Sequence, residues 1–421
     1  MSKNIFSIKT IQAREILDSR GNPTVECSIK LKSGAEARAS VPSGVSVGKF
    51  EALELRDCDQ KRYHGKGVLK AVSNIEKYLA PILIGKDSRN QDEIDQKMLE
   101  LDGTNNKSKY GANSILAISL AIARVASLAQ RIPLWEWIKQ LKGGSQKNFN
   151  HPKITLLFNL INGGAHADNK LEIQEFWFVP KNCSNIKEAV RMASEVFHDL
   201  INLAKENGYS TNVGDEGGIA PNLEKNTEAI ELILRAGELA GYKQKEDFVL
   251  GLDVAASSFF ENGQYMLKSE GASVLAEQLI AIYNEWSSIY PLKFIEDGLD
   301  EEDWVGWKNL TQRLGKNLTL IGDDLLATNP EKLQKAIQKK ACNAILIKLN
   351  QIGTLTETLK VINLAQANNF QVVVSHRSGE TADDFIADLA IGASADAIKT
   401  GAPCRGERVV KYNRLMEILE Y

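Results

Sequence analysis

The sequence predicts an α/β fold in which a smaller α+β domain precedes a (β/α)8-type barrel. Six short apolar runs in the C-terminal half end 23 to 43 residues apart, which is about the length of a strand plus its crossover helix. The 270 residues from position 152 to 421 are close to the roughly 250 of a typical barrel. Residues 1–140 differ from this pattern and favour strands followed by helices.

The N-terminal part favours a strand hairpin and then helical segments. Residues 5–17 and 24–31 alternate apolar and polar side chains, as antiparallel strands do, and residues 18–23 form a turn between them. Helical periodicity follows at roughly residues 67–83, 90–101 and 111–129. Strands followed by helices are typical of a small α+β domain.

The most apolar stretch, residues 116–129, has to be weighed as a membrane span. It carries Arg124 and is shorter than the about 20 apolar residues that cross a bilayer. We therefore expect a buried helix and no membrane span. The N-terminus also lacks the apolar centre of a secretory signal.

A polar, Gly/Ser-rich stretch at residues 141–151 predicts a linker between the two parts of the chain. It separates an expected N-terminal domain, residues 1–140, from an expected barrel domain, residues 152–421. Within the barrel, residues 152–245 favour two strands and then two helices. Regular alternation of strands and helices is clearest after residue 245.

Composition and charge are those of an ordinary globular protein. The 421-residue chain is 43% hydrophobic and has a net charge of −3, so electrostatics gives no reason to expect nucleic acid or an anionic membrane as partner. The five cysteines are scattered, and no pair has the spacing of metal ligands or of a redox motif. We expect a reduced, cytoplasmic protein.

Each of the six apolar runs ends on a charged or imidazole side chain: Asp253, Glu296, Asp323, Lys348, His376 and Lys399. The C-terminal ends of barrel strands face one mouth, so these side chains should meet. Three carboxylates suit a hard cation such as Mg²⁺, and nitrogen and sulfur groups are too few for structural zinc. A single acid could equally cap the helix after its strand, but three at equivalent positions favour a metal site.

Lys348 and Lys399 end two further strands, where a buried lysine is unfavourable unless it is paired or functional. Neighbouring cations lower the pKa of a lysine and make it a usable base near neutral pH. The alternative is that both lysines form structural ion pairs with the carboxylates.

Glycine- and serine-rich loops offer further polar groups. Arg377 provides a fork for phosphate or carboxylate, and a helix that begins after it would add amide donors. Alternatively, residues 213–222 form an ordinary acidic turn, His166 is a surface histidine, and residues 41–49 form a linker. The segments are residues 41–49 with Ser46, 162–169 with His166, 173–176 with Gln174 and Glu175, 213–222 with Glu216, and 375–381 with Ser375, Arg377 and Ser378.

Taken together, these segments resemble the enolase family, the phosphopyruvate hydratases. The resemblance covers essentially the whole chain, and such a series of motifs in this order is highly specific. Besides the loops above, the matching segments are residues 13–26, 51–57, 101–104, 398–401 and 411–413.

The resemblance implies a barrel of the enolase kind behind a small α+β domain, and a homodimer. It implies two Mg²⁺ ions per site, the second arriving with the substrate. Asp253, Glu296 and Asp323 would hold the first ion, and Ser46 would join the second. The implied reaction is the reversible dehydration of 2-phosphoglycerate to phosphoenolpyruvate.

The resemblance also implies catalytic roles. Lys348 would remove the proton from C2, and Glu216, assisted by Glu175, would help the C3 hydroxyl leave as water. Lys399 and His376 would contact the carboxylate and hydroxyl side of the substrate.

The remaining site residues are expected to bind the substrate. Arg377 and Ser378 would hold its phosphate, with Ser375 beside them. Gln174 and His166 would complete the pocket, with His166 carried on a loop that closes over it.

The chain departs from the family pattern around Ser46, where Val45 and Val47 replace the usual alanine and threonine. Ser258 stands where a glutamate is usual, and Asp396 and Ala397 replace glycine and glutamine. These changes keep two alternatives open. One is a related barrel enzyme acting on another carboxylate, and the other is a catalytically weak relative retained as a binding protein.

Overall fold

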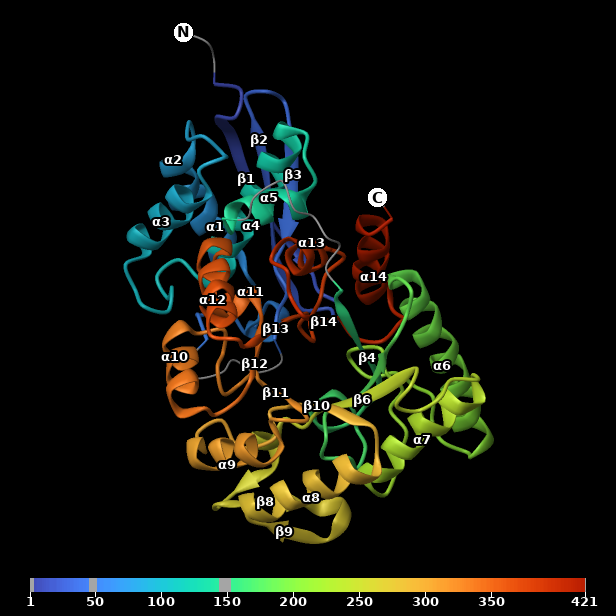
Figure 1. Ribbon diagram of the computed structural model, residues 1–421. Coiled ribbons are helices and arrows are strands. Elements are labelled where there is room, and N and C mark those ends of the chain that lie inside the picture. The colour runs from blue at the N-terminus through green and yellow to red at the C-terminus, as the bar shows by residue number, and fades with distance from the viewer. Residues whose placement is uncertain (1–3, 45–50, 144–152, 421) are drawn as a thin grey trace.

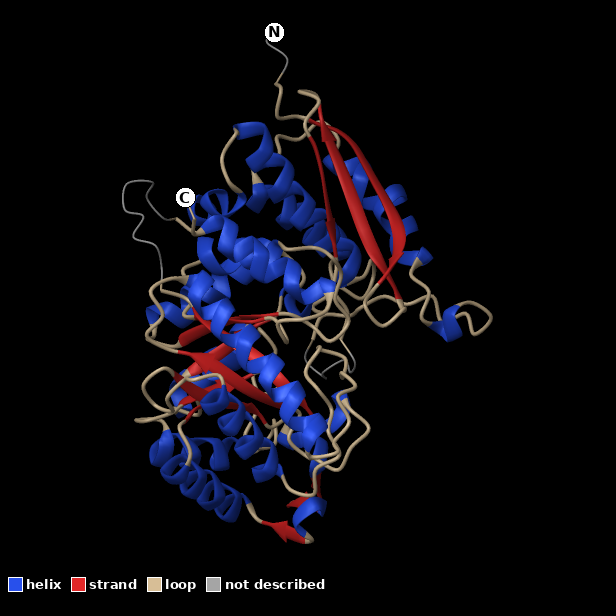
Figure 2. Ribbon diagram, turned by 90° about the vertical axis from the view of Figure 1, so that its right-hand side faces the viewer, coloured by secondary structure: helices blue, strands red, loops and turns tan. Residues whose placement is uncertain are grey.

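The computed structural model describes residues 4–44, 51–143 and 153–420, which fold into a smaller N-terminal part and a barrel (Figure 1). The N-terminal part has an antiparallel sheet of β1 (Ile8–Leu17), β2 (Pro23–Leu31) and β3 (Glu36–Ser40). Its helices are α1 (Leu69–Asn74), α2 (Ala80–Leu83), α3 (Gln91–Asp102), α4 (Ala112–Gln130) and α5 (Leu134–Leu141). In Figure 2 the long strands of this sheet lie to one side of the barrel, with helices between them.

These elements confirm the expected hairpin and helices, with three differences. β1 begins at Ile8, not at residue 5, and the polar β3 carried too weak an apolar pattern to be expected. The helix expected at residues 67–83 is divided into α1 and α2 by a π-helical turn, Ile75–Leu79. Pro81 follows this turn and has no N–H to donate, so a wider turn there avoids a broken hydrogen-bond ladder.

The barrel is closed by eight strands. They are β4 (Thr155–Asn162), β5 (Glu175–Pro180), β6 (Phe248–Asp253), β10 (Leu292–Glu296), β11 (Thr319–Gly322), β12 (Ala344–Ile347), β13 (Gln371–Ser375) and β14 (Ala397–Lys399). All neighbours are parallel except that β5 runs antiparallel to β4 and β6. The start of β5 therefore lies at the same mouth as the ends of the other strands.

Helices cover the outside of the barrel. They are α6 (Ile186–Glu206), α7 (Asn226–Leu239), α8 (Ala276–Ile289), α9 (Trp304–Leu314), α10 (Pro330–Lys339), α12 (Leu355–Ala367), α13 (Phe385–Gly392) and α14 (Gly406–Ile418). The short α11 (Leu349–Ile352) follows β12 at the mouth. A small sheet of β7 (Phe260–Glu261), β8 (Gln264–Leu267) and β9 (Ala272–Val274) follows β6. The order of β4, β5, α6 and α7 confirms the expected two strands and two helices.

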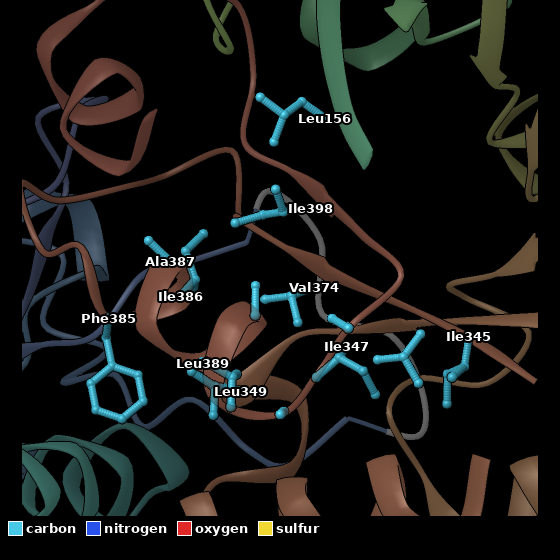
Figure 3. Packing of buried hydrophobic residues seen from close by; sticks show 14 of the residues in the cluster. Leu156, Ile345, Ile347, Leu349, Val374, Phe385, Ile386, Ala387, Leu389 and Ile398 are labelled. Atoms are coloured by element: carbon cyan, nitrogen blue, oxygen red, sulfur yellow. The ribbon is translucent and has the colours of Figure 1, made fainter. Parts of the chain in front are cut away.

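Side-chain alternation along the strands builds two cores. Residues that face into the barrel form one buried cluster: Leu157, Trp177, Val179, Phe294, Ile321, Ala344, Leu346, Val373 and Ala397. Their neighbours in sequence face outward and pack under the helices. Figure 3 shows this outer layer, where Ile347, Val374 and Ile398 meet Ile386 and Leu389 of α13.

The N-terminal part is joined to the barrel by α4 and by buried polar contacts. α4 is long and apolar enough to cross a membrane by length and composition, but it is a core helix here, because 83% of its most apolar stretch is buried. The Arg124 guanidinium, on α4, lies 2.7 Å from an Asp383 oxygen and 2.6 Å from an Asp384 oxygen. Asp95, on α3, accepts a hydrogen bond from the Thr356 backbone amide at 3.1 Å.

The stability of this junction should depend on the protonation of Asp95. Burial raises the pKa of its carboxyl to about 6, against about 3.9 in an unfolded chain. A raised folded-state pKa stabilises the fold below about pH 4, and this contribution is lost as the pH rises through about 6. As the pH rises from about 4 to 7, Asp95→Asn should therefore become more stable relative to the unmodified protein, by up to about 3 kcal/mol of unfolding free energy. Urea unfolding at a series of pH values measures it, and a pH-independent difference would contradict the expectation.

Candidate active site

The charged residues at the barrel mouth continue the inward-facing alternation of the strands. Asp253 and Glu296 are the last residues of β6 and β10 and lie opposite each other in register. Asp323 and Lys348 are the next inward positions after Ile321 and Leu346, and Lys399 is the next after Ala397. The expected convergence of these strand ends is what the structure shows.

Lys399 lies among three carboxylates. Its ammonium donates hydrogen bonds to Glu175 Oε1 at 3.1 Å, Asp253 Oδ2 at 3.2 Å and Glu296 Oε1 at 2.8 Å. The Gln174 amide lies beside them and donates to Asp253 Oδ2 at 3.3 Å. All four charged side chains are at most 5% exposed, so water screens their interactions little.

Lys348 lies on the neighbouring part of the mouth and donates a hydrogen bond to Asp323 Oδ2. The other Asp323 oxygen accepts from the Gln351 amide at 3.2 Å. Burial lowers the pKa of Lys348, but the Asp323 carboxylate outweighs it, so the net direction is upward. Arg377 and Lys399 also lower the pKa of Lys348, but less than Asp323 raises it, so the lowered pKa expected from the sequence would require a cation that engages Asp323.

The carboxylates are suited to hold a divalent cation. Glu296 is fully buried, and its Oε2 has no hydrogen-bond partner among the described residues. Burial, and then the charge of Asp253, raise the pKa of Glu296 well above its usual range, and a bound cation would favour its charged form. An oxygen-only donor set of this kind fits Mg²⁺. Ser46, expected at the second ion, lies outside the described residues.

Glu216 occupies the facing side of the cavity between two histidines. Its Oε2 lies 3.2 Å from His376 Nε2, and its Oε1 lies 3.7 Å from His166 Nδ1. The Asn159 amide donates to Oε2 at 3.1 Å. Ligating atoms of His166, Glu175 and Glu216 all lie within 4.8 Å of one another, so the two carboxyls form a close pair.

His376 is neutral and its tautomer is fixed by Arg408. The Arg408 guanidinium can only donate, and it lies 2.6 Å from His376 Nδ1, so the ring proton is on Nε2 and faces Glu216. Burial, and then the charge of Arg408, lower the pKa of His376 to about 4 although Glu216 opposes them. His376 can therefore offer an N–H donor at neutral pH without carrying a charge.

Arg377 and Ser378 follow β13 and line the same cavity. The Ser378 hydroxyl lies 3.1 Å from His166 Nε2, and Ser375 turns its hydroxyl to the His376 carbonyl at 3.0 Å. Arg377 Nη1 donates to Glu51 Oε2 at 3.3 Å, and both side chains are less than one-tenth exposed. Glu51 thus reaches the cavity from the N-terminal part.

The expectation that residues 375–381 lead directly into a helix is wrong, because α13 begins only at Phe385. Arg408 holds the carbonyl oxygens of Arg377 and Ser378 at 2.6 and 2.7 Å, and the Ser19 hydroxyl holds the Glu380 amide at 3.1 Å. These contacts use backbone groups that a helix would need. Any anion at this loop is bound by side chains and loop amides instead of a helix N-terminus.

The cavity has a volume of about 390 Å³, which suits a small metabolite. Of the sequence-predicted site residues that the structure describes, all except Glu296 line it. They are His166, Gln174, Glu175, Glu216, Asp253, Asp323, Lys348, Ser375, His376, Arg377, Ser378 and Lys399.

Asp297, Asp324, Arg408 and Glu51 are among the described residues of the site that were not found from the sequence. Asp297 accepts the Asp323 and Asp324 amides at 2.9 and 2.8 Å, and these three acids have oxygens within 4.8 Å of one another. Asp297 directly follows Glu296 and Asp324 directly follows Asp323, so both could have been predicted from these positions. Arg408 lies on a helix and Glu51 in another part of the chain, and neither position follows from strand periodicity.

Family models match both parts of this structure. The enolase N-terminal domain model matches residues 8–138. The enolase C-terminal TIM barrel domain model matches residues 154–421. The two matches cover nearly the whole chain, and they agree with the observed order of a smaller N-terminal part followed by a barrel. The chain belongs to the enolase family.

Proposed function

We propose that the protein catalyses the reversible, Mg²⁺-dependent dehydration of 2-phosphoglycerate to phosphoenolpyruvate. The observation that supports this best is the placement of Lys348 and Glu175. Lys348 follows β12 and Glu175 begins β5, and these strands are four apart in both directions around the eight-stranded barrel. A substrate between them meets an amine on one face and a carboxyl pair on the other, as an anti elimination requires.

Lys348 is proposed as the base. Its amine takes the C2 proton, and the electrons of the C–H bond pass into the substrate carboxylate to give an enolate. These electrons then form the C2–C3 double bond as the C3–O bond breaks. The carboxyl pair protonates the departing hydroxyl, which leaves as water. Mg²⁺ held by Asp253, Glu296 and Asp323 would stabilise negative charge on the substrate carboxylate as the C2 proton leaves.

The carboxyl pair of Glu175 and Glu216 is proposed as the acid. Burial, and then the neighbouring Glu216, raise the pKa of Glu175 well above its usual range, which favours the shared proton that an acid pair needs. Two carboxyls that interact this strongly titrate together, and the proton belongs to the pair. The neutral His376 N–H and the Lys399 ammonium are proposed to contact the hydroxyl and carboxylate side of the substrate.

Arg377 and Ser378 are proposed to hold the phosphate, with His166 and Ser375 close by. A guanidinium can bind two phosphate oxygens at once, which favours a phosphorylated substrate over the related non-phosphorylated acids. Gln174 keeps Asp253 in place by its hydrogen bond to Oδ2.

The direct test is to mix the purified protein with 2-phosphoglycerate, titrate Mg²⁺ and follow the ultraviolet absorbance of the enol product. Product formation that needs Mg²⁺ and stops on chelation supports the substrate, the metal and the reaction together. If folded protein that binds Mg²⁺ forms no product, the proposal fails. A panel of non-phosphorylated 2-hydroxy acids then tests the related barrel enzyme.

Glu51 should compete with phosphate for Arg377. Glu51→Gln removes the carboxylate that pairs with the guanidinium but keeps the size of the side chain, so inorganic phosphate should bind about tenfold more tightly. Isothermal titration with inorganic phosphate measures this, and Arg377→Gln is the negative control. Equal or weaker binding by Glu51→Gln would mean that Glu51 orients Arg377 without competing for it.

A homodimeric, cytoplasmic protein is also proposed, on the family membership alone. Light scattering during size-exclusion chromatography measures the mass in solution. We expect twice the chain mass of 46.5 kDa, and a species of the single-chain mass at micromolar concentration would contradict the dimer.

A further inference from the structure

Trp177 lies inside the barrel directly beneath the charged residues of the mouth. It is an inward-facing residue of β5, two positions after Glu175, and it is fully buried. Its indole N–H donates a hydrogen bond to Glu175 Oε2 at 2.8 Å. The other Glu175 oxygen accepts from Lys399 at 3.1 Å. The two hydrogen bonds together fix the orientation of the carboxyl group.

The same ring also lies beneath Lys399. The Lys399 ammonium is 5.1 Å from the centre of the Trp177 ring, within the distance at which a cation is attracted to an aromatic face. One side chain from the barrel interior therefore contacts two residues of the proposed site, through its N–H and through its ring face.

The barrel makes room for this ring at Gly251, which lies opposite Trp177 in register on β6. A Cβ at position 251 would lie 2.5 Å from Trp177 Cε3 and 3.0 Å from Phe294 Cβ. The indole can occupy this place because its partner on the neighbouring strand has no side chain. Burial and this close packing against β6 restrict the orientation of the ring, and with it the direction of its N–H.

We propose that Trp177 is a positioning residue of the active site, which holds Glu175 and Lys399 from inside the barrel. The inference rests on the proposed function, because it assigns Trp177 an effect on the reaction that Glu175 and Lys399 serve. Trp177 does not contact the substrate. Its effect is to keep the acid pair and the ammonium in the arrangement that the elimination needs.

Trp177→Phe separates the two contacts, because it keeps an aromatic face under Lys399 and removes the N–H. A hydrogen bond to a charged group of this kind corresponds to about tenfold to hundredfold in rate, so kcat should fall by that factor while KM changes less than about threefold. The matched control is Trp307→Phe. Trp307 is also fully buried, but its N–H donates to the Asp300 carbonyl, away from the cavity, at 3.2 Å.

A double-mutant cycle distinguishes positioning from a general loss of packing. If Trp177 acts through Glu175, Trp177→Phe should lower kcat by no more than about twofold when Glu175→Gln is already present. Additive losses in the cycle, or equal losses in Trp177→Phe and Trp307→Phe, would overturn the proposal. Thermal unfolding of each variant checks that the proteins compared are folded.

A measurement without turnover tests the contact itself. The protein has six tryptophans, so ¹⁵N-labelled protein should give six indole N–H signals, and Trp177→Phe identifies the one from Trp177. That signal should shift in Glu175→Gln, and an unchanged signal would overturn the inference. If the unmodified protein does not turn over 2-phosphoglycerate, the proposed function fails while this measurement still decides the contact. If the unmodified protein does convert 2-phosphoglycerate and the double-mutant cycle is additive, only the role of Trp177 is refuted.

Discussion

Replacing Lys348 by alanine should abolish the exchange of the C2 proton of 2-phosphoglycerate with solvent. Lys348 provides the proposed base on its side of the cavity, and a positioned general base contributes about 10²- to 10⁴-fold to the rate. The loss in kcat should be at least of this order. Proton NMR of the substrate in deuterated water measures the exchange directly, even where the second half of the reaction is slow.

Magnesium binding must survive for this result to identify the base. The Lys348 ammonium bonds to Asp323, so its removal frees a carboxylate oxygen and takes away no metal ligand. Calorimetry should therefore show Mg²⁺ affinity at least as high as in the unmodified protein. Lys360→Ala is the matched control, because Lys360 pairs with Asp92 on the surface and is 67% exposed. Exchange at an undiminished rate in Lys348→Ala would refute the assignment.

Glu296→Gln should weaken Mg²⁺ binding at least about 100-fold. Loss of a group that merely supports a ligand already weakens a metal site about 10- to 100-fold, and Glu296 is proposed as a ligand itself. Glutamine has nearly the same shape and keeps an oxygen for Lys399, but it lacks the negative charge. The substitution tests the role of the buried Oε2, which has no hydrogen-bond partner in the described part of the chain.

The measurement is the rise in unfolding free energy on addition of Mg²⁺. A 100-fold loss of affinity removes up to about 2.7 kcal/mol of that rise when Mg²⁺ saturates the unmodified protein. Glu302→Gln, an exposed position in the loop after β10, serves as the control for a change of one charge. Equal stabilisation of all three proteins by Mg²⁺ would show that the ion is held elsewhere.

The convergence of the strand-end residues followed from the sequence because two simple rules act together. Parallel barrel strands end at one mouth, and alternation along each strand decides which side chains point inward. Asp253, Glu296 and Lys399 meet for these reasons alone. Glu175 needed more, because its strand is antiparallel and presents its first residue at the mouth.

Contacts between distant segments did not follow from any local pattern. Arg408 is one of several charged residues on α14, and only the folded chain shows that it fixes the ring of His376. Glu51 meets Arg377 across 326 positions of sequence, through the packing of the two parts of the chain. The hydrogen bond from Trp177 to Glu175 is local, but in the sequence Trp177 is indistinguishable from any other apolar core residue of a strand.

The alternation that fills the barrel also restricts which changes of strand length the fold can tolerate. Two strands show this constraint. Leu346 and Ala397 pack inside the barrel, and the residues two positions later, Lys348 and Lys399, line the cavity. Inserting or deleting one residue in such a strand would turn both side chains outward together. The same two-residue alternation along each strand therefore places both the core residues and the site residues. Length changes in descendants of this chain should therefore fall in the loops, and drift in activity should come through substitutions.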